Sequence, residues 1–214
     1  LASETQVNVR GVYAHSIGRL RLEENDRARA IEAILDLSTV NGEDAHPSTL
    51  EGVALGLEAM MRNARGASIG ERAQGRLSNL TFYDRVRQQY GRQSVRVRLL
   101  ALSAMGQAGS ITVEFIESGM RDPNARVRTV AARYLNVVVP AARSEFIRRG
   151  LLDESVGVRI ATVQQLAREP RDEVVCERLL AVATRDENQG VRLIALDALG
   201  DPCTDPDVPI QALL

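Results

Sequence analysis

Residues 186–199 read DENQGVRLIALDAL, and the same pattern recurs at residues 153–166 and 122–135. In each copy an Asp comes first, a Val-Arg pair follows five and six positions later, and a Leu lies seven positions beyond the Arg. Two looser copies, around Val97-Arg98 and Val9-Arg10, keep the pair but lack the leading Asp. A recurring segment of this kind is typical of solenoid proteins, in which each repeat packs on its neighbours.

The spacing of the later copies is regular. Their arginines stand at positions 98, 128, 159 and 192, which gives a period near 30 residues, enough for two short helices and two turns. Apolar residues at helical spacing predict first helices of each pair over about 94–106, 124–138, 155–168 and 188–199. They predict second helices over about 110–121, 141–152 and 172–185. None of these helices buries its apolar stripe alone, so we expect neighbouring helices to cover it.

The first half of the chain follows the pattern less closely. Residues 1–61 contain degenerate repeats, in which Val9, Val12 and Tyr13 predict one apolar or small face of a helix. Residues 41–48 are interpreted as a loop, with Pro47 at a helix start. Residues 62–91 form an irregular basic insertion, and residues 92–214 form regular repeats of which the last is truncated.

These residues resemble the HEAT-repeat family and its bacterial HEAT-like relatives. The resemblance is close over residues 92–205 and loose over 1–61. It implies an all-α fold: a right-handed α–α superhelix of about six helix pairs, forming a single domain over residues 1–214. From the spacing, we interpret the leading Asp as the cap of the helix that follows it.

In the family, the Asp and Arg of successive repeats form a hydrogen-bonded ladder. Carried over to matching positions, this implies a structural ladder of Asp122, Asp153 and Asp186 with Arg128, Arg159 and Arg192. The first half departs from the pattern, because Arg92 and Glu4 stand where Arg98 and Arg10 require an Asp. The resemblance therefore does not extend the ladder to these two arginines.

Composition restricts the function. Aromatic residues make up 3% of the chain. The formal net charge is -1, so the chain as a whole has no electrostatic field that attracts nucleic acid or an anionic membrane. Some HEAT-like enzymes bind metal through His-Glu dipeptides, but His15 precedes Ser16 and His46 precedes Pro47. Adjacent acids, such as Asp153-Glu154, are interpreted as solvated capping acids. We predict no metal, no cofactor and no catalytic residue.

The two cysteines, Cys176 and Cys203, lie far apart and belong to no CxxC motif. A buried free thiol is the simplest interpretation of Cys176, in an apolar helical run, and a disulfide stays open. The chain begins at Leu1 and ends at Leu214 within a predicted helix, so we expect a fragment of a longer chain. A cytoplasmic location is favoured, and an extracytoplasmic domain of a larger protein stays open.

Residues 62–98 carry nine arginines and two acids, with Phe82, Tyr83 and Tyr90 between them. One interpretation is that these arginines are solvated or paired within the protein. The others are a surface for an acidic protein partner or for nucleic acid. The candidate partner-binding residues are Arg62, Arg65, Arg72, Arg76, Arg85, Arg87 and Arg92.

We therefore expect a non-enzymatic scaffold that binds a protein or peptide partner through the solenoid surface. One alternative is a nucleic-acid-binding HEAT-like protein that uses residues 62–98. A second alternative is a lyase-type HEAT-like enzyme. We expect a monomer or weak oligomer with no membrane span in this segment.

Overall fold

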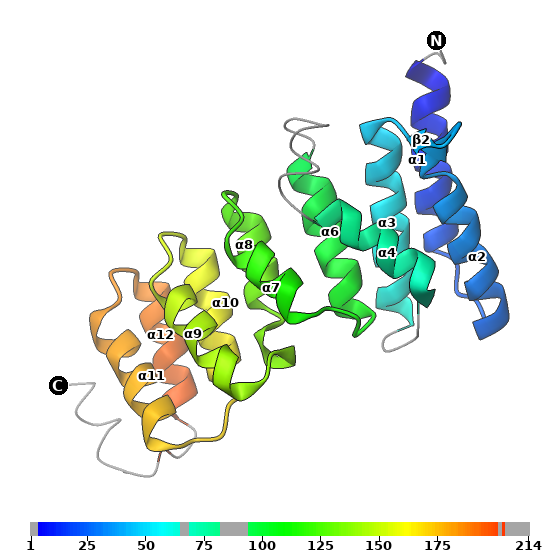
Figure 1. Ribbon diagram of the computed structural model, residues 1–214. Helices are drawn as coiled ribbons and strands as arrows, with labels where there is room; N and C mark the ends of the chain where they lie inside the picture. Colours follow the sequence, from blue (N-terminus) through cyan, green and yellow to red (C-terminus); the bar gives the residue numbers. More distant parts are fainter. Residues whose placement is uncertain (1–3, 65–68, 82–93, 201–202, 204–214) are drawn as a thin grey trace. The chain divides into compact units, whose positions relative to one another are not determined.

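A computed structural model of the chain describes residues 4–64, 69–81, 94–200 and 203. The fold is all-α apart from one short β-hairpin in these residues (Figure 1). The chain divides into two compact units, residues 1–122 and residues 123–214, and each is described by itself.

Unit 1 contains six of the described helices, packed in two layers. The helices α1, α3 and α6 pack in succession, and α2 and α4 pack beside them. Their bounds are α1 (Glu4–Gly18), α2 (Glu24–Asp36), α3 (Pro47–Asn63), α4 (Gly70–Thr81), α6 (Ser94–Gln107) and α7 (Val113–Met120). Buried aliphatic side chains such as Leu50, Leu57, Leu77 and Leu102 fill the space between the layers.

The hairpin between α2 and α3 corrects the interpretation of residues 41–48 as a plain loop. Strand β1 (Thr39–Val40) pairs antiparallel with β2 (Glu43–Asp44). The two residues between them, Asn41 and Gly42, have φ values of 52° and 82°. An Asn-Gly pair with positive φ at both positions is the preferred two-residue hairpin turn, so the signal was present in the sequence. Pro47 begins α3, as predicted.

The packing of α1 on α3 corrects a second prediction. Val9, Val12 and Tyr13 do not face the core and are exposed instead. The buried face of α1 is made of Gly11, Ala14 and Gly18, and it lies directly on the backbone of α3. The absence of side chains brings the two backbones together: an ideal Cβ added at Gly18 would lie 2.0 Å from the carbonyl oxygen of Gly56. Small residues therefore decide which face of α1 is inside.

Unit 2 repeats one arrangement, in which α8, α10 and α12 pack in succession and α11 packs against α12. The element bounds are α8 (Ala125–Ala132), η2 (Leu135–Val137), α9 (Pro140–Leu151), α10 (Val156–Leu166), α11 (Glu173–Arg185) and α12 (Gln189–Leu199). The side chains of Phe146, Ile147 and Val158 are buried, as predicted.

The helix predicted over residues 124–138 is shorter in the structure. It ends at Ala132, and a 3₁₀ turn at Leu135–Val137 follows. Pro140 begins α9, and the preceding Val139 is extended with ψ 144°. A residue before proline disfavours the helical conformation, so the chain must leave the helix before Pro140.

The leading Asp of each repeat is not the helix cap, which corrects a further prediction. The N-cap residues of α8, α10 and α12 are Asn124, Ser155 and Asn188, each two positions after the Asp. Asn188 accepts hydrogen bonds from the backbone N–H groups of Gly190 and Val191 at 2.9 and 3.3 Å. The Asp side chains are therefore available for other partners.

Cys176 and Cys203 form a disulfide, so the interpretation of Cys176 as a free thiol is wrong. Their Cα atoms are 5.8 Å apart. Cys176 lies on α11, and α11 and α12 are packed neighbours. Residue 203, which follows α12, meets α11 although 27 positions separate the two cysteines. The spacing of the two cysteines in the sequence does not predict this tertiary contact.

Reduction of this disulfide is expected to lower the free energy of unfolding by about 3 kcal/mol, because a loop of this length gains chain entropy when it is opened. Chemical unfolding with and without dithiothreitol measures the difference. A Cys176→Ala, Cys203→Ala double variant is the control, since its stability must not respond to the reductant. Equal stability of the oxidised and reduced wild-type chains would contradict the expectation.

Candidate functional site

Three buried arginine–aspartate pairs connect successive helices, and we call each pair a rung. The arginines lie on α6, α8 and α10, and each aspartate precedes the next first-of-pair helix. In each rung Nε donates to one carboxylate oxygen at 2.7 or 2.8 Å and Nη2 donates to the other at 3.0 Å. The pairs are Arg98–Asp122, Arg128–Asp153 and Arg159–Asp186. This two-pronged geometry is the strongest form of arginine–carboxylate pairing.

The first rung was missed by sequence reasoning. The resemblance left the ladder open at Arg98, because Arg92 stands six positions before it, whereas the partner of Arg98 is Asp122 of the following repeat. Arg98 is also the most buried of these arginines, with 1% of its side chain exposed. The signal was present, because each arginine is followed by an Asp 24, 25 or 27 positions later. Arg10 forms no such rung with a described residue and donates to the carbonyl oxygens of Leu37 and Thr39.

The repeat arginines of unit 2, Arg128, Arg159 and Arg192, also donate to backbone carbonyl oxygens of their own repeats. Nη1 of Arg159 donates to the carbonyl oxygens of Asp153 and Glu154 at 2.9 and 3.2 Å. Nη1 of Arg192 donates to the corresponding oxygens of Asp186 and Glu187 at 2.8 and 3.2 Å. Arg192 is thus held in the same position as Arg159.

The third rung lowers the pKa of the Asp186 carboxyl group. Burial alone raises this pKa, but the hydrogen bonds from Arg159 and the backbone of Asn188, with the charges of Arg159 and Arg192, outweigh it. A group whose pKa is lowered on folding contributes stability above its ordinary pKa, near 3.9 for Asp, and loses it as the pH falls. The rung therefore holds at neutral pH and weakens in acid.

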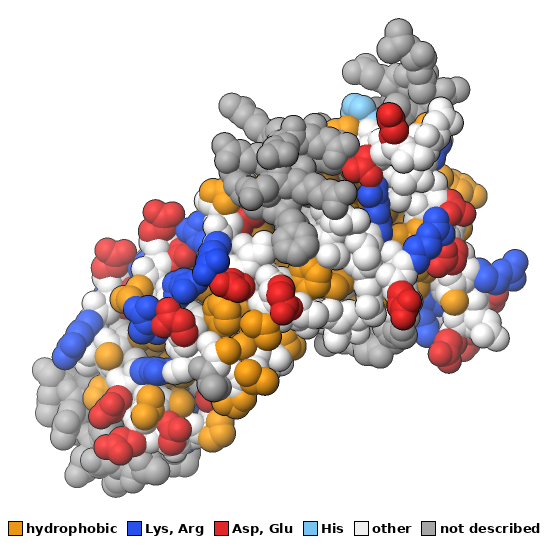
Figure 2. All heavy atoms as spheres, in the orientation of Figure 1, with side chains coloured by type: hydrophobic (Ala, Val, Ile, Leu, Met, Phe, Trp, Pro, Cys, Tyr) orange, Lys and Arg blue, Asp and Glu red, His pale blue; other side chains and the backbone are white. Residues whose placement is uncertain are grey.

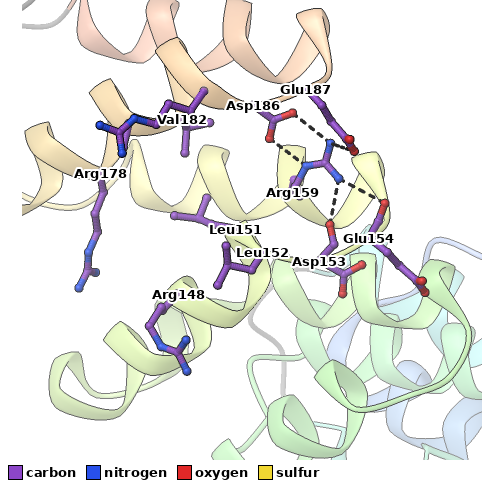
Figure 3. A pocket seen from close by; sticks show the side chains of 12 residues that line it. Arg148, Leu151, Leu152, Asp153, Glu154, Arg159, Arg178, Val182, Asp186 and Glu187 are labelled. Atoms are coloured by element: carbon purple, nitrogen blue, oxygen red, sulfur yellow. Dashed lines mark hydrogen bonds and ion pairs between the residues drawn. The ribbon is translucent and has the colours of Figure 1, made fainter.

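A groove in unit 2 lies between the C-terminal ends of α9 and α11, and its volume is about 580 Å³ (Figure 3). Leu151, Leu152 and Val182 give its apolar part, and the third rung lies at one end. The full lining consists of Arg148, Leu151, Leu152, Asp153, Glu154, Arg159, Arg178, Ala181, Val182, Arg185, Asp186 and Glu187. Sequence reasoning missed this groove, because it depends on how three helices meet.

The groove combines an exposed apolar side chain with two guanidinium groups that have no carboxylate partner among the described residues. Leu152 is 74% exposed. Arg178 donates to the hydroxyl of Ser144 at 2.9 Å, and neither it nor Arg185 faces a carboxylate among the described residues. Arg148 differs, because Glu145 pairs with it. The groove thus places apolar surface beside guanidinium groups.

The acidic side chains of the groove are either paired with arginines in rungs or largely exposed to solvent. Asp153 and Asp186 belong to rungs. Glu154 and Glu187 add a second contact to the same arginines, but their side chains are 86% and 82% exposed. The lining contains no serine, cysteine, histidine or lysine.

The structure places the basic segment as follows. Arg72 contacts Glu32 and Asp36, and Arg76 contacts Asp44. Arg62 lies 3.7 Å from Glu58, and Arg96 lies 2.9 Å from Glu51. Arg65, Arg85, Arg87 and Arg92 lie outside the described residues.

Each described arginine of this segment therefore has a carboxylate neighbour within unit 1, Arg98 and its partner Asp122 included. Figure 2 shows basic and acidic side chains interspersed over the described surface of the visible face. The described part of residues 62–98 thus has the internally paired arrangement. It does not present a continuous positive surface of the kind that binds nucleic acid.

No group of three or more potential metal ligands occurs among the described residues. Within the same residues, no helix has the length and apolarity needed to cross a bilayer. Comparison with protein-family models, curated proteins and solved structures finds no match to this chain.

Proposed function

We propose that this chain is a non-enzymatic HEAT-like repeat scaffold, and that the groove of unit 2 binds a peptide segment of a protein partner. The observation that carries the proposal is the exposed Leu152 beside Arg178 and Arg185 on the groove wall. An exposed leucine in a concave site gains most when an apolar side chain covers it.

The charges of the groove define the partner more closely. Arg178 and Arg185 lie on the same helix, α11, seven positions or about two turns apart. An extended peptide that places an aliphatic or aromatic side chain on Leu152 can direct Asp or Glu side chains to these arginines. Guanidinium groups recognise carboxylates with two parallel hydrogen bonds. We therefore infer an acidic segment with at least one large apolar residue.

Peptide display on the intact chain tests this proposal. Selection is expected to enrich segments with Leu, Ile or Phe beside Asp or Glu. An enriched peptide, labelled for fluorescence polarisation, is expected to bind Leu152→Glu at least tenfold more weakly, because a buried apolar anchor contributes about 1.4 kcal/mol or more. Arg178→Ala, Arg185→Ala should weaken binding and reduce its dependence on salt.

Leu193→Glu is the matched control, since it makes the same change at an exposed leucine of α12 outside the groove. It is expected to leave peptide affinity unchanged. Selection that enriches no such motif, or an enriched peptide that binds Leu152→Glu as tightly as wild type, would contradict the proposal.

A further inference from the structure

The turn of the β-hairpin in unit 1 places an asparagine directly before a glycine at an exposed position. Asn41 and Gly42 lie between β1 and β2, beyond the paired residues Val40 and Glu43, and both are exposed. A Cβ added at Gly42 would meet no atom within 4 Å, so no described atom outside the neighbouring residues crowds this glycine. The side-chain amide of Asn41 is thus next to an unobstructed backbone nitrogen.

An asparagine in this position can lose ammonia without an enzyme. The backbone nitrogen of Gly42 attacks the side-chain carbonyl carbon Cγ of Asn41, so that an N–Cγ bond forms and the Cγ–Nδ2 bond breaks. Nδ2 leaves as ammonia and takes the proton of the Gly42 N–H. Water then opens the resulting succinimide ring at one of its two carbonyls, which yields aspartate or, when the main chain passes through the side-chain carbonyl, isoaspartate. A side chain on the following residue obstructs ring closure, and glycine has none.

The other asparagines of the chain lack this neighbour. None of them precedes a glycine, because the residue that follows is Val, Asp, Ala, Leu or Gln. Asn124 and Asn188 are also helix N-caps, and their side-chain oxygens accept hydrogen bonds from the backbone N–H groups of Arg126 and Gly190. An amide that is held in this way does not reach the next backbone nitrogen. Ring closure is therefore least hindered at Asn41.

The fold controls this reaction through the conformation of the turn. The φ values of 52° at Asn41 and 82° at Gly42 are those of a type I′ turn. Closure of the five-membered ring requires the backbone of Asn41 to leave this left-handed conformation, so the hairpin must open first. Its strands are only two residues long and exposed along their whole length. A hairpin of two strands has little stability of its own, so transient opening is expected.

Two arginines from neighbouring helices hold the base of the hairpin. Nη2 of Arg76, on α4, donates to the carbonyl oxygen of Ser38 at 2.8 Å, and Nη1 donates to Oδ1 of Asp44 at 2.6 Å. Nη2 of Arg10, on α1, donates to the carbonyl oxygen of Thr39 at 3.2 Å. The hairpin therefore opens against contacts with both helices.

We propose that Asn41 is a site of spontaneous deamidation in the folded chain, and that opening of the hairpin sets the rate. Either product adds a carboxylate close in sequence to those of Glu43 and Asp44, and like charges on paired strands are destabilising. Isoaspartate also adds a methylene group to the main chain, which the two-residue turn between Val40 and Glu43 does not accommodate. The modified hairpin is weaker, and the arginines at its base lose part of the backbone to which they donate.

Incubation of the folded 214-residue chain, followed by peptide mapping with mass spectrometry, tests the proposal. The peptide that contains Asn41 is expected to gain the mass difference between an amide and an acid, with release of an equal amount of ammonia. Protein isoaspartyl methyltransferase, used as a probe, is expected to methylate the same peptide. The peptides that contain Asn124 and Asn188 are internal controls and are expected to stay unchanged.

Variants separate the chemistry from the opening step. Asn41→Gly keeps a turn-forming pair but has no amide, so it is expected to give neither product. Arg76→Ala removes contacts at the base of the hairpin and is expected to raise the deamidation rate about fivefold, which is the effect of one lost hydrogen bond on an opening equilibrium. The chain unfolded in guanidinium chloride is expected to react faster still. Asp44→Ala, at an exposed position, replaces Arg76→Ala where that variant does not fold.

The proposal is overturned by an Asn41 peptide that keeps its amide for as long as the chain retains its folded circular dichroism spectrum, while the unfolded chain loses it. Loss of the amide first at another asparagine would also overturn it. Equal rates in the wild type, in Arg76→Ala and in the unfolded chain would show that the hairpin does not control the reaction.

Discussion

Asp122→Ala is expected to lower the free energy of unfolding by about 3–5 kcal/mol, because it leaves the guanidinium of Arg98 buried without its carboxylate. The two side chains are only 1% and 2% exposed, so water cannot replace the lost partner. Urea unfolding followed by circular dichroism measures the loss. The aspartate matters less as an attractive charge than as the group that permits Arg98 to be buried.

Two further variants test that reason. Asp153→Ala breaks the more exposed second rung and is expected to cost less, about 1–2 kcal/mol, because Glu154 still reaches Arg128 at 3.1 Å. Replacing both partners, as in Arg98→Met with Asp122→Leu, is expected to recover most of the stability, since an apolar pair needs no counter-charge. If Asp122→Ala and the wild type unfold at the same urea concentration, the burial of Arg98 does not depend on its pairing with Asp122, and the prediction is wrong.

The double variant Gly18→Ala, Gly52→Ala is expected to lower the free energy of unfolding by about 4 kcal/mol, because overpacking at one buried site costs about 1–3 kcal/mol and here two sites are filled. The added Cβ atoms would lie 2.0 Å from the carbonyl oxygen of Gly56 and 2.1 Å from that of Gly11. Both obstacles are backbone atoms, so no side chain can rotate to relieve the overlap. The helices α1 and α3 must separate instead.

Gly75→Ala provides the control with the opposite sign. Gly75 lies inside α4, and an added Cβ there meets no atom within 4 Å. The same substitution is expected to stabilise the chain by about 0.5–1 kcal/mol, because alanine loses less conformational entropy in a helix than glycine. If the Gly18, Gly52 double variant were as stable as the wild type, α1 and α3 would not be in backbone contact.

The sequence predicts the second half of the chain well because its repeats are local and regular. The helices α10 and α12 begin and end within two residues of the predicted bounds. Buried residues such as Val158 and Val191 follow directly from the helical period. In α1 the period is equally clear, but the prediction of an apolar inner face fails. Hydrophobic patterning cannot show that glycines on the opposite face permit a closer, and therefore preferred, helix contact.

The repeat spacing predicts only part of the candidate sites. The pairing of Arg98 with Asp122 required knowledge that an arginine reaches forward to the next repeat. The groove could not be predicted, because the exposure of Leu152 depends on where α9 ends relative to α11. The net positive charge of residues 62–98 suggested a binding surface. Two of its arginines, Arg72 and Arg76, meet acids that lie 32 to 40 positions earlier in the chain, such as Asp44 for Arg76.

The disulfide has a mechanical consequence. It encloses residues 177–202 in a covalent loop, so tension applied from beyond Cys203 passes across the bridge to Cys176. Most of α11 and all of α12 lie inside this loop and carry no load while the bridge is intact. The enclosed part includes Arg178 and Arg185 of the groove wall and Arg192 of α12. A stretched chain thus keeps these arginines in a mechanically relaxed segment, and reduction would place them in the path of the force.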